Sequence, residues 1–302
     1  MKIAALDIGG TSIKSGIWEE GNLYGLKEHE TRAKAGGAAV MEQAKQALGE
    51  CGKFDAIGIS TAGQVDPWEG YIRFANDNIP GYTGMRIREI MEKEFGVPVA
   101  VENDVNAAAL GEGRFGAGLG EPDFLCATYG TGVGGAIVVG GEVYRGSACS
   151  AGEFGGILIH PQDRVPGDPF SGCYERYAST TALVNKAKEL DPGLDNGRKI
   201  FARIDEPKVR AVVEQWAEEI AYGLVTLVCI FNPSCIILGG GVMAQPYILE
   251  RVEEKVRKQI MPSFGGLKLR QATLGNQAGL LGAAWLGSQK LQGFSQKGRN
   301  EP

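Results

Sequence analysis

Two glycine-rich segments constrain the fold of this chain more than any other feature of its sequence. Residues 7–14 (DIGGTSIK) lie between two apolar segments, and residues 128–135 (TYGTGVGG) lie between apolar strands expected at 124–127 and 136–139. Glycine lets a backbone turn tightly and approach a ligand closely. We therefore expect each segment to form the turn of a β-hairpin whose backbone can face a phosphate group.

The first turn also carries side chains suited to a phosphorylated ligand. Thr11 and Ser12 offer hydroxyl groups, and Asp7 stands where Mg²⁺ with its water shell could be held near a phosphate. The segment is not a Walker-type loop, because it lacks Gly-Lys-Ser/Thr ahead of a helix. The phosphate contacts predicted at this turn are Gly9, Gly10, Thr11 and Lys14.

A third glycine-rich segment follows a short apolar strand. Residues 235–238 (CIIL) run directly into Gly239, Gly240 and Gly241, so a flat ligand can lie against bare backbone. Two such hairpins and one such strand end together resemble the actin, sugar-kinase and heat-shock ATPase superfamily. That resemblance implies a duplicated, RNase H-like α/β fold with ATP in a cleft between two lobes. Further ATP contacts are then expected at Gly130, Thr131, Gly132, Gly134 and the three strand-end glycines.

Composition limits the classes of partner. The chain has 302 residues, enough for two domains, and its net charge of −5 argues against nonspecific nucleic-acid binding. Its start resembles neither a signal peptide nor a membrane span, because residue 2 already enters the first expected strand. The six cysteines lie far apart in the sequence, which favours reduced thiols and a cytoplasmic location.

The order of apolar and glycine-rich segments repeats once along the chain. Residues 2–118 predict a hairpin followed by helices at 36–50, 85–95 and 104–113 and strands at 55–60 and 98–101. Residues 119–302 repeat this order, with a long helix at 205–231 and a closing helix at 277–291. We expect two α/β lobes divided near residue 118, with the closing helix packing back towards the first lobe.

The segment 101–108 (VENDVNAA) carries the candidate catalytic group. It follows a short strand and opens a helix, so Asp104 lies near a helix amino end, where an ionised carboxylate is favoured. A carboxylate there could accept a hydroxyl proton while Asn103 positions the hydroxyl group. Helix capping by Asp104 is the alternative role, and the tetrapeptide alone does not separate the two.

With this segment the resemblance becomes specific. The chain is similar to the ROK family of bacterial sugar kinases and repressors at residues 7–14, 102–108, 130–135, 152–155, 178–179, 232–241 and 276–283. The resemblance implies that Asp104 deprotonates the primary hydroxyl group of a sugar and that ATP and Mg²⁺ are used. It also implies that sugar hydroxyl groups are bound by Asn78, Asn103, Glu153 and Glu175.

The chain departs from the family in the segment that normally builds a structural zinc site. Gly156 occupies the position of a zinc-binding histidine, and of the usual cysteines only Cys173 remains. One thiolate cannot form a closed four-ligand site, so we expect no bound zinc. His160 and Asp168 are candidate substitutes, although a lone loop histidine more often packs or faces solvent. Some family members that phosphorylate β-glucosides also lack this motif, so we expect Gly156 to leave room for a larger acceptor.

These features predict an ATP-dependent hexose kinase that phosphorylates the 6-hydroxyl group. A β-glucoside or N-acetylmannosamine acceptor is the alternative within this class, and a catalytically silent sugar sensor is the alternative outside it. A nicotinamide-dependent enzyme is excluded, because neither hairpin shows strand, GxGxxG and helix in that order. Family members are often homodimers, so we expect a dimer as a possible assembly.

Overall fold

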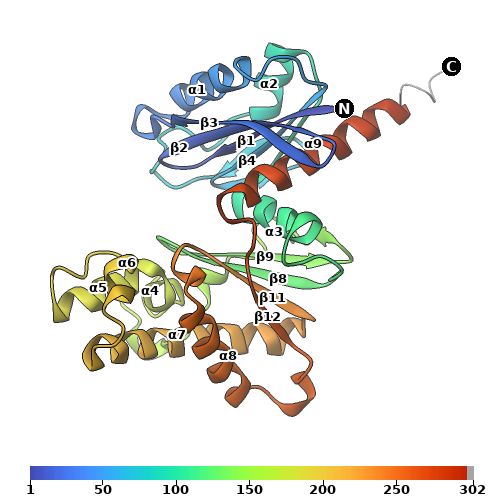
Figure 1. Cartoon of the computed structure of the whole chain (residues 1–302). Helices are drawn as coiled ribbons and strands as arrows, with labels where there is room; N and C mark the ends of the chain where they lie inside the picture. Colours follow the sequence, from blue (N-terminus) through green and yellow to red (C-terminus); the bar gives the residue numbers. More distant parts are fainter. Residues whose placement is uncertain (298–302) are drawn as a thin grey trace. The chain divides into compact units, whose positions relative to one another are not determined.

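The computed structural model describes residues 1–297, which form two compact units (Figure 1). Unit 1 comprises Met1–Gly116, Gly146–Ser150 and the segment that begins at Asn276. Unit 2 comprises Ala117–Arg145 and Ala151–Gly275. No helix within the described residues is both long and apolar enough to cross a membrane.

Unit 1 is built on a five-stranded sheet with the strand order β3-β2-β1-β4-β7. The first three strands pair antiparallel, whereas β1, β4 and β7 run parallel. A small antiparallel pair, β5 with β6, lies outside this sheet. The bounds are β1 (Lys2–Ile8), β2 (Ser12–Glu19), β3 (Asn22–Glu30), β4 (Ala56–Thr61), β5 (Gln64–Asp66), β6 (Tyr71–Phe74) and β7 (Val99–Asn103).

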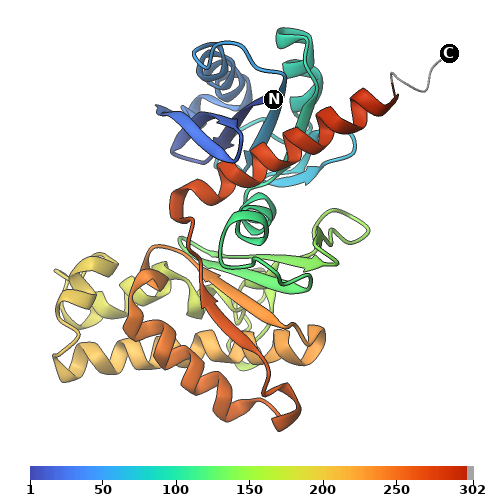
Figure 2. The same cartoon turned by 45° about the vertical axis from the view of Figure 1, so that its right-hand side comes forward.

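The helices of unit 1 cover both faces of its sheet (Figures 1 and 2). Successive residues of a strand point to opposite faces, so Ala4 and Leu6 of β1 join one apolar cluster with α1 and α2. Ile3 and Ala5 join a second cluster with Leu280 of α9. The bounds are α1 (Gly37–Gly49), α2 (Ile87–Phe95), α3 (Asp104–Phe115) and α9 (Ala278–Lys297).

Helix α9 approaches its neighbours at glycines. A Cβ atom at Gly58 of β4 would collide with the carbonyl group of Ala283, and one at Gly282 would collide with the carbonyl group of Ala107 in α3. Backbone groups cannot rotate away as a side chain can. The lack of side chains at these positions therefore allows α9 to lie against both β4 and α3.

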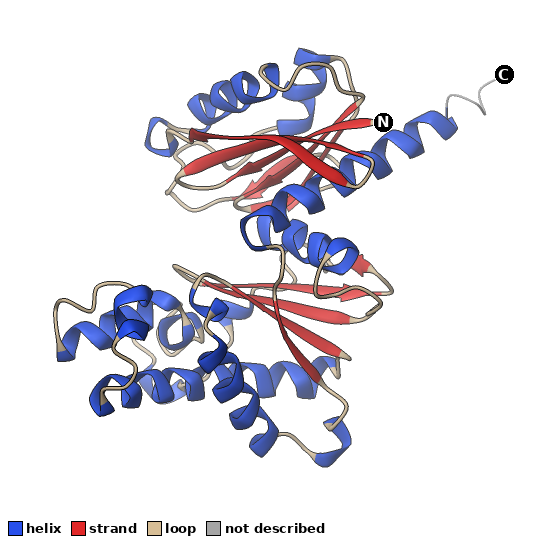
Figure 3. Cartoon of the chain, viewed as in Figure 1, coloured by secondary structure: helices blue, strands red, loops and turns tan. Residues whose placement is uncertain are grey.

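Unit 2 has a sheet of the same kind, with the strand order β10-β9-β8-β11-β12. β8 pairs antiparallel with β9, whereas β8, β11 and β12 run parallel. Helices α4 to α8 pack on one face of this sheet, where they share one apolar cluster with it (Figure 3). The bounds are β8 (Phe124–Tyr129), β9 (Val133–Val139), β10 (Glu142–Val143), β11 (Cys235–Gly239), β12 (Lys268–Gln271), α4 (Glu175–Ala178), α5 (Thr180–Leu190), α6 (Gly197–Ala202), α7 (Pro207–Phe231) and α8 (Pro246–Gln259).

The shared strand order confirms the predicted duplication. In each unit a hairpin leads, and two parallel strands extend the sheet on the side of its first strand. Residues 9–11 form the turn between β1 and β2, and residues 130–132 form the turn between β8 and β9, as expected. The parallel strands of each sheet thus end at one edge, where ligands bind in open α/β sheets.

Candidate functional site

Three polar side chains meet where the parallel strands of unit 1 end. Asp7 lies opposite Ser60 in the β1–β4 register, and Ser60 Oγ donates a hydrogen bond to Asp7 Oδ1 over 2.7 Å. Asp104 follows directly after β7 as the first residue of α3. The sequence analysis identified the two carboxylates but missed Ser60, which has no motif of its own and is revealed only by strand register.

The first residues of α3 decide whether Asp104 caps this helix. The N-cap of this helix is Asn103, whose Oδ1 accepts hydrogen bonds from the backbone amides of Val105 and Asn106 at 3.0 and 3.1 Å. Asn103 also donates through Nδ2 to the Gly63 carbonyl oxygen and to Asp104 Oδ1, each over 2.9 Å. The capping role considered for Asp104 was therefore wrong, because the preceding amide side chain already fills it.

The electrostatics of this edge suit proton transfer near neutral pH. Burial and, to a smaller extent, the nearby charge of Asp7 raise the pKa of Asp104 to about 6. Hydrogen bonds from the Val105 amide and from Asn103 oppose this increase in the pKa of Asp104. Burial also raises the pKa of Asp7, against the hydrogen bond from Ser60 and the charge of Lys14. A carboxylate with a pKa near 6 is a competent general base at pH 7.

Behind these groups lies a buried carboxylate that the sequence analysis did not assign. Glu102 is 1% exposed, and its Oε1 accepts hydrogen bonds from the Asn103 amide at 3.0 Å and from Asn106 Nδ2 at 3.1 Å. The first contact fixes the backbone where β7 becomes α3. Glu102 therefore supports the residues that carry Asn103 and Asp104.

Unit 2 contains a pocket of about 800 Å³ beside the second glycine-rich turn. Of the predicted ATP contacts, Gly130, Thr131 and Gly241 line it, whereas Gly132, Gly134, Gly239 and Gly240 do not. The sequence analysis missed a set of polar and charged lining residues because they lie in helices and loops without a motif. These are Thr180, Thr181, Asn185, Lys188, Asp195, Asn196, Arg198 and Gln245.

The glycine-rich backbone beside this pocket is closely packed. Gly240 has φ +111°, and a Cβ atom there would collide with the carbonyl group of Tyr129. Thr180 donates its backbone amide to the Gly130 oxygen over 2.9 Å, and Thr181 Oγ1 donates to the Thr131 oxygen over 2.8 Å. The start of α5 thus holds the 130–132 turn in place.

The four predicted sugar-binding residues have different surroundings. Asn78, in unit 1, is exposed in a turn after β6, and Asn103 lies beside Asp104. Glu153, in unit 2, is exposed at the start of a short 3₁₀ helix. Glu175 is half-buried, and its Oε2 accepts a hydrogen bond from the Val133 amide over 3.1 Å. The structure thus brings Asn103 to the catalytic candidate and Glu175 to the glycine-rich turn.

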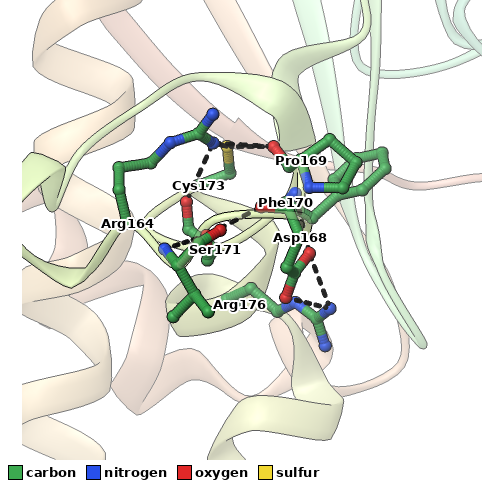
Figure 4. Close-up of polar contacts among 8 residues, drawn as sticks. Arg164, Asp168, Pro169, Phe170, Ser171, Cys173 and Arg176 are labelled. Carbon is green, nitrogen blue, oxygen red and sulfur yellow. Dashed lines mark hydrogen bonds and ion pairs between the residues drawn. The ribbon is translucent and has the colours of Figure 1, made fainter.

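The segment between Gly156 and Glu175 is held together by Arg164 (Figure 4). One guanidinium nitrogen donates to the carbonyl oxygens of Pro169 and Ser171 at 2.8 and 3.1 Å and lies 3.9 Å from Cys173 Sγ. Ser171 Oγ adds hydrogen bonds with the Val165 amide and the Asp168 oxygen. A hydrogen-bond network centred on Arg164 therefore organises this segment, in which the sequence analysis expected no zinc site.

The two candidate substitutes for zinc ligands have other partners. His160 Nε2 lies 2.6 Å from Glu219 Oε2, and Asp168 pairs with Arg176 at 3.2 Å. Within residues 1–297, no three histidine, cysteine, aspartate or glutamate residues are grouped as metal ligands. The absence of zinc from the working protein stays a prediction.

The chain matches the ROK family over residues 3–290. It is 35% identical to a β-glucoside kinase of Listeria innocua over 94% of this chain and 97% of that protein. It is 34% identical to a glucokinase of Streptomyces coelicolor over 92% of this chain and 95% of that protein.

A solved structure agrees with these relatives. The ROK family glucokinase from Streptomyces griseus, in complex with glucose and AMPPNP, superposes with a TM-score of 0.82 at 33% identity and covers 96% of this chain and 100% of that one. Fold and sequence therefore agree, and the chain belongs to the ROK family.

Proposed function

We propose that this protein is an ATP-dependent sugar kinase that transfers the γ-phosphoryl group to the 6-hydroxyl group of a hexose. The observation that carries the proposal is Asp104, a carboxylate held by Asn103 and by the Val105 amide, with a pKa of about 6. As the hydroxyl oxygen attacks the γ-phosphorus, Asp104 accepts its proton and the bond to ADP breaks. Such transfer asks mainly for positioning and for stabilisation of charge.

Unit 2 is the proposed nucleotide lobe, and unit 1 supplies the base and its own phosphate turn. The pocket beside Gly130 and Thr131 has the size of a cofactor site, and Gly241 also lines it. The glucokinase from Streptomyces griseus binds AMPPNP, which supports ATP as the donor here. Because ATP is made and used inside cells, we expect the enzyme to act in the cytoplasm.

Magnesium is the proposed metal, with Asp7 as its contact through water. The hydrogen bond from Ser60 uses one lone pair of Asp7 Oδ1 and leaves Oδ2 for water around a cation. A single carboxylate that leaves most of the water shell in place suits Mg²⁺. When bound, Mg²⁺ would neutralise charge on the β- and γ-phosphates.

The acceptor is proposed to contact Asn78, Asn103, Glu153 and Glu175. Free glucose is one candidate, as in the relative from Streptomyces coelicolor. A β-glucoside is the other, and it is favoured by Gly156, which is exposed and would have no atom within 4 Å of a Cβ atom. Open space at this position would admit a substituent on the first carbon of the sugar.

The test is ADP release from Mg·ATP with a panel of sugars. We expect turnover with glucose or with the β-glucosides cellobiose and gentiobiose, and loss of turnover in Asp104→Asn. The Asp77→Asn variant, which neutralises an exposed carboxylate of the same unit, is the control. Sugar binding without turnover by the wild-type protein would instead favour the sensor.

The oligomeric state of the protein can be tested directly. We propose a homodimer, as in many members of the family. Light scattering after size-exclusion chromatography would give twice the monomer mass of 32.1 kDa for a dimer. A single monomeric peak across the micromolar concentration range would contradict the proposal.

A further inference from the structure

Glu175 contacts the glycine-rich turn as well as lying in the proposed sugar site. Its Oε2 accepts the Val133 amide over 3.1 Å, and a Cβ atom added at Gly132 would collide with the same carboxylate. The contact joins residues that are 42 positions apart in the sequence. Glu175 therefore bears directly on the backbone at the end of the 130–132 turn.

The chain just after Glu175 holds the start of the same turn. Thr180 donates to the Tyr129 oxygen through Oγ1 over 3.0 Å and to the Gly130 oxygen through its amide over 2.9 Å. Thr181 donates to the Thr131 oxygen over 2.8 Å. Glu175, Thr180 and Thr181 thus contact successive parts of the turn, and Glu175 is the charged one of the three.

The position of Gly132 shows how closely the carboxylate and the turn fit. The three atoms nearest to an added Cβ atom all belong to the Glu175 side chain. The carboxylate therefore occupies the space that any side chain at position 132 would need. An alanine at this position can be accommodated only if the Glu175 carboxylate moves away from the Val133 amide.

We propose that Glu175 is a positioning residue for ATP: its carboxylate fixes the 130–133 backbone in the shape that receives the phosphates. This inference rests on the proposed function, since it takes the turn to bind phosphate. The opposite oxygen, Oε1, has no hydrogen-bond partner among the described residues and stays available to a sugar hydroxyl group. One carboxylate then links the affinity for sugar to the affinity for nucleotide, and the linkage is reciprocal.

The experiment measures Mg·AMPPNP binding by calorimetry, without sugar and without turnover. Glu175→Ala removes the acceptor for the Val133 amide and should weaken AMPPNP binding about fivefold to tenfold, as loss of a charged acceptor at a partly exposed site implies. Glu175→Gln retains an acceptor oxygen and should bind within about twofold of wild type. Glu250→Ala, at an exposed position of α8, is the charge-matched control.

Gly132→Ala supplies an independent test, because its methyl group would displace the Glu175 side chain. Alone it should weaken AMPPNP binding about fivefold, whereas in the Glu175→Ala background it should add less than about twofold. A loss of stability caused by Glu175→Ala does not disturb this test. The single variant Glu175→Ala is compared with the double variant Glu175→Ala/Gly132→Ala, and both proteins carry the same destabilising change. Circular dichroism establishes that each variant is folded.

Two results would overturn the inference. One is unchanged AMPPNP affinity in folded Glu175→Ala, and the other is an equal effect of Gly132→Ala with and without Glu175. A carboxylate that contacts sugar alone would raise the KM for sugar and leave AMPPNP binding unchanged. Failure of wild-type protein to bind Mg·AMPPNP would overturn the proposed function and this inference together, whereas normal wild-type binding with either result above would overturn the inference alone.

Discussion

Neutralising the candidate base should stabilise the protein at alkaline pH. Burial and the charge of Asp7 raise the pKa of Asp104 from its ordinary value of 3.8 to about 6 in the folded chain. The folded state therefore binds this proton more tightly than the unfolded state does. Keeping Asp104 ionised costs stability above pH 6, and the cost disappears as the pH falls towards 4.

The size of the effect follows from the same difference in pKa. A change from 3.8 to about 6 corresponds to at most about 3 kcal/mol, at about 1.4 kcal/mol per pH unit. Asp104 retains some exposure, so the measured value should lie below this limit. Asp104→Asn preserves the side-chain shape and can still accept the hydrogen bond from the Val105 amide.

Urea unfolding of wild type and Asp104→Asn at pH 8, 7, 6 and 5 measures the difference. We expect the variant to be more stable by about 1–3 kcal/mol at pH 8 and by about half of that at pH 5. The same variant should lose kinase turnover, so gain of stability and loss of activity would occur together. A difference that does not change with pH, or a less stable variant at pH 8, would refute the assignment of a buried, destabilised carboxylate.

Three further predictions concern other residues of the site and the fold. Asp7→Asn removes a neighbouring charge and should lower the pKa of Asp104 from about 6, which an NMR titration of the Asp104 carboxyl carbon can follow; an unchanged titration would contradict the coupling. Arg164→Met removes the donor to the Pro169 and Ser171 oxygens and should lower the free energy of local unfolding of this segment by about 1 kcal/mol. Thermolysin should then cleave within residues 161–173 about fivefold faster, and Arg210→Met is the control. Gly282→Ala should lower the free energy of unfolding by about 3 kcal/mol, because its methyl group meets the Ala107 carbonyl group. Gly293→Ala, in the same helix but with open space around it, should raise the free energy of unfolding by about 0.5–1 kcal/mol. Similar effects at both positions would contradict the packing of α9.

Local patterns sufficed to predict the parts of the fold that carry clear apolar periodicity. The hairpins around residues 9–11 and 130–132, the buried strand β4 and the closing helix α9 were all predicted near their observed bounds. Strand β3 was missed, because seven of its nine residues are exposed and it lacks the alternation that marks a half-buried strand. Strands β5 and β6 and helix α6 are too short to show a period.

The same distinction separates the site residues that could be predicted from those that could not. Asp7, Asn103 and Asp104 lie in continuous motifs, and the structure groups Asn103 with Asp104. Ser60 and the contact between Glu175 and Val133 depend on chain segments brought together by folding. Gly132 indicated only that some group approaches the backbone closely at this position. The sequence could not show that this group is the Glu175 side chain rather than a ligand.

The return of the chain to unit 1 at Asn276 affects how the molecule is synthesised. During translation, β1, β4 and β7 leave the ribosome long before α9, whose Leu280 and Ala284 cover one face of the sheet. Until then that face is open to water and to other nascent chains, whereas unit 2 can complete its core from Ala117–Arg145 and Ala151–Gly275. The unit made first should therefore mature last, and chaperones that bind apolar surfaces should recognise ribosome-stalled chains that end before α9.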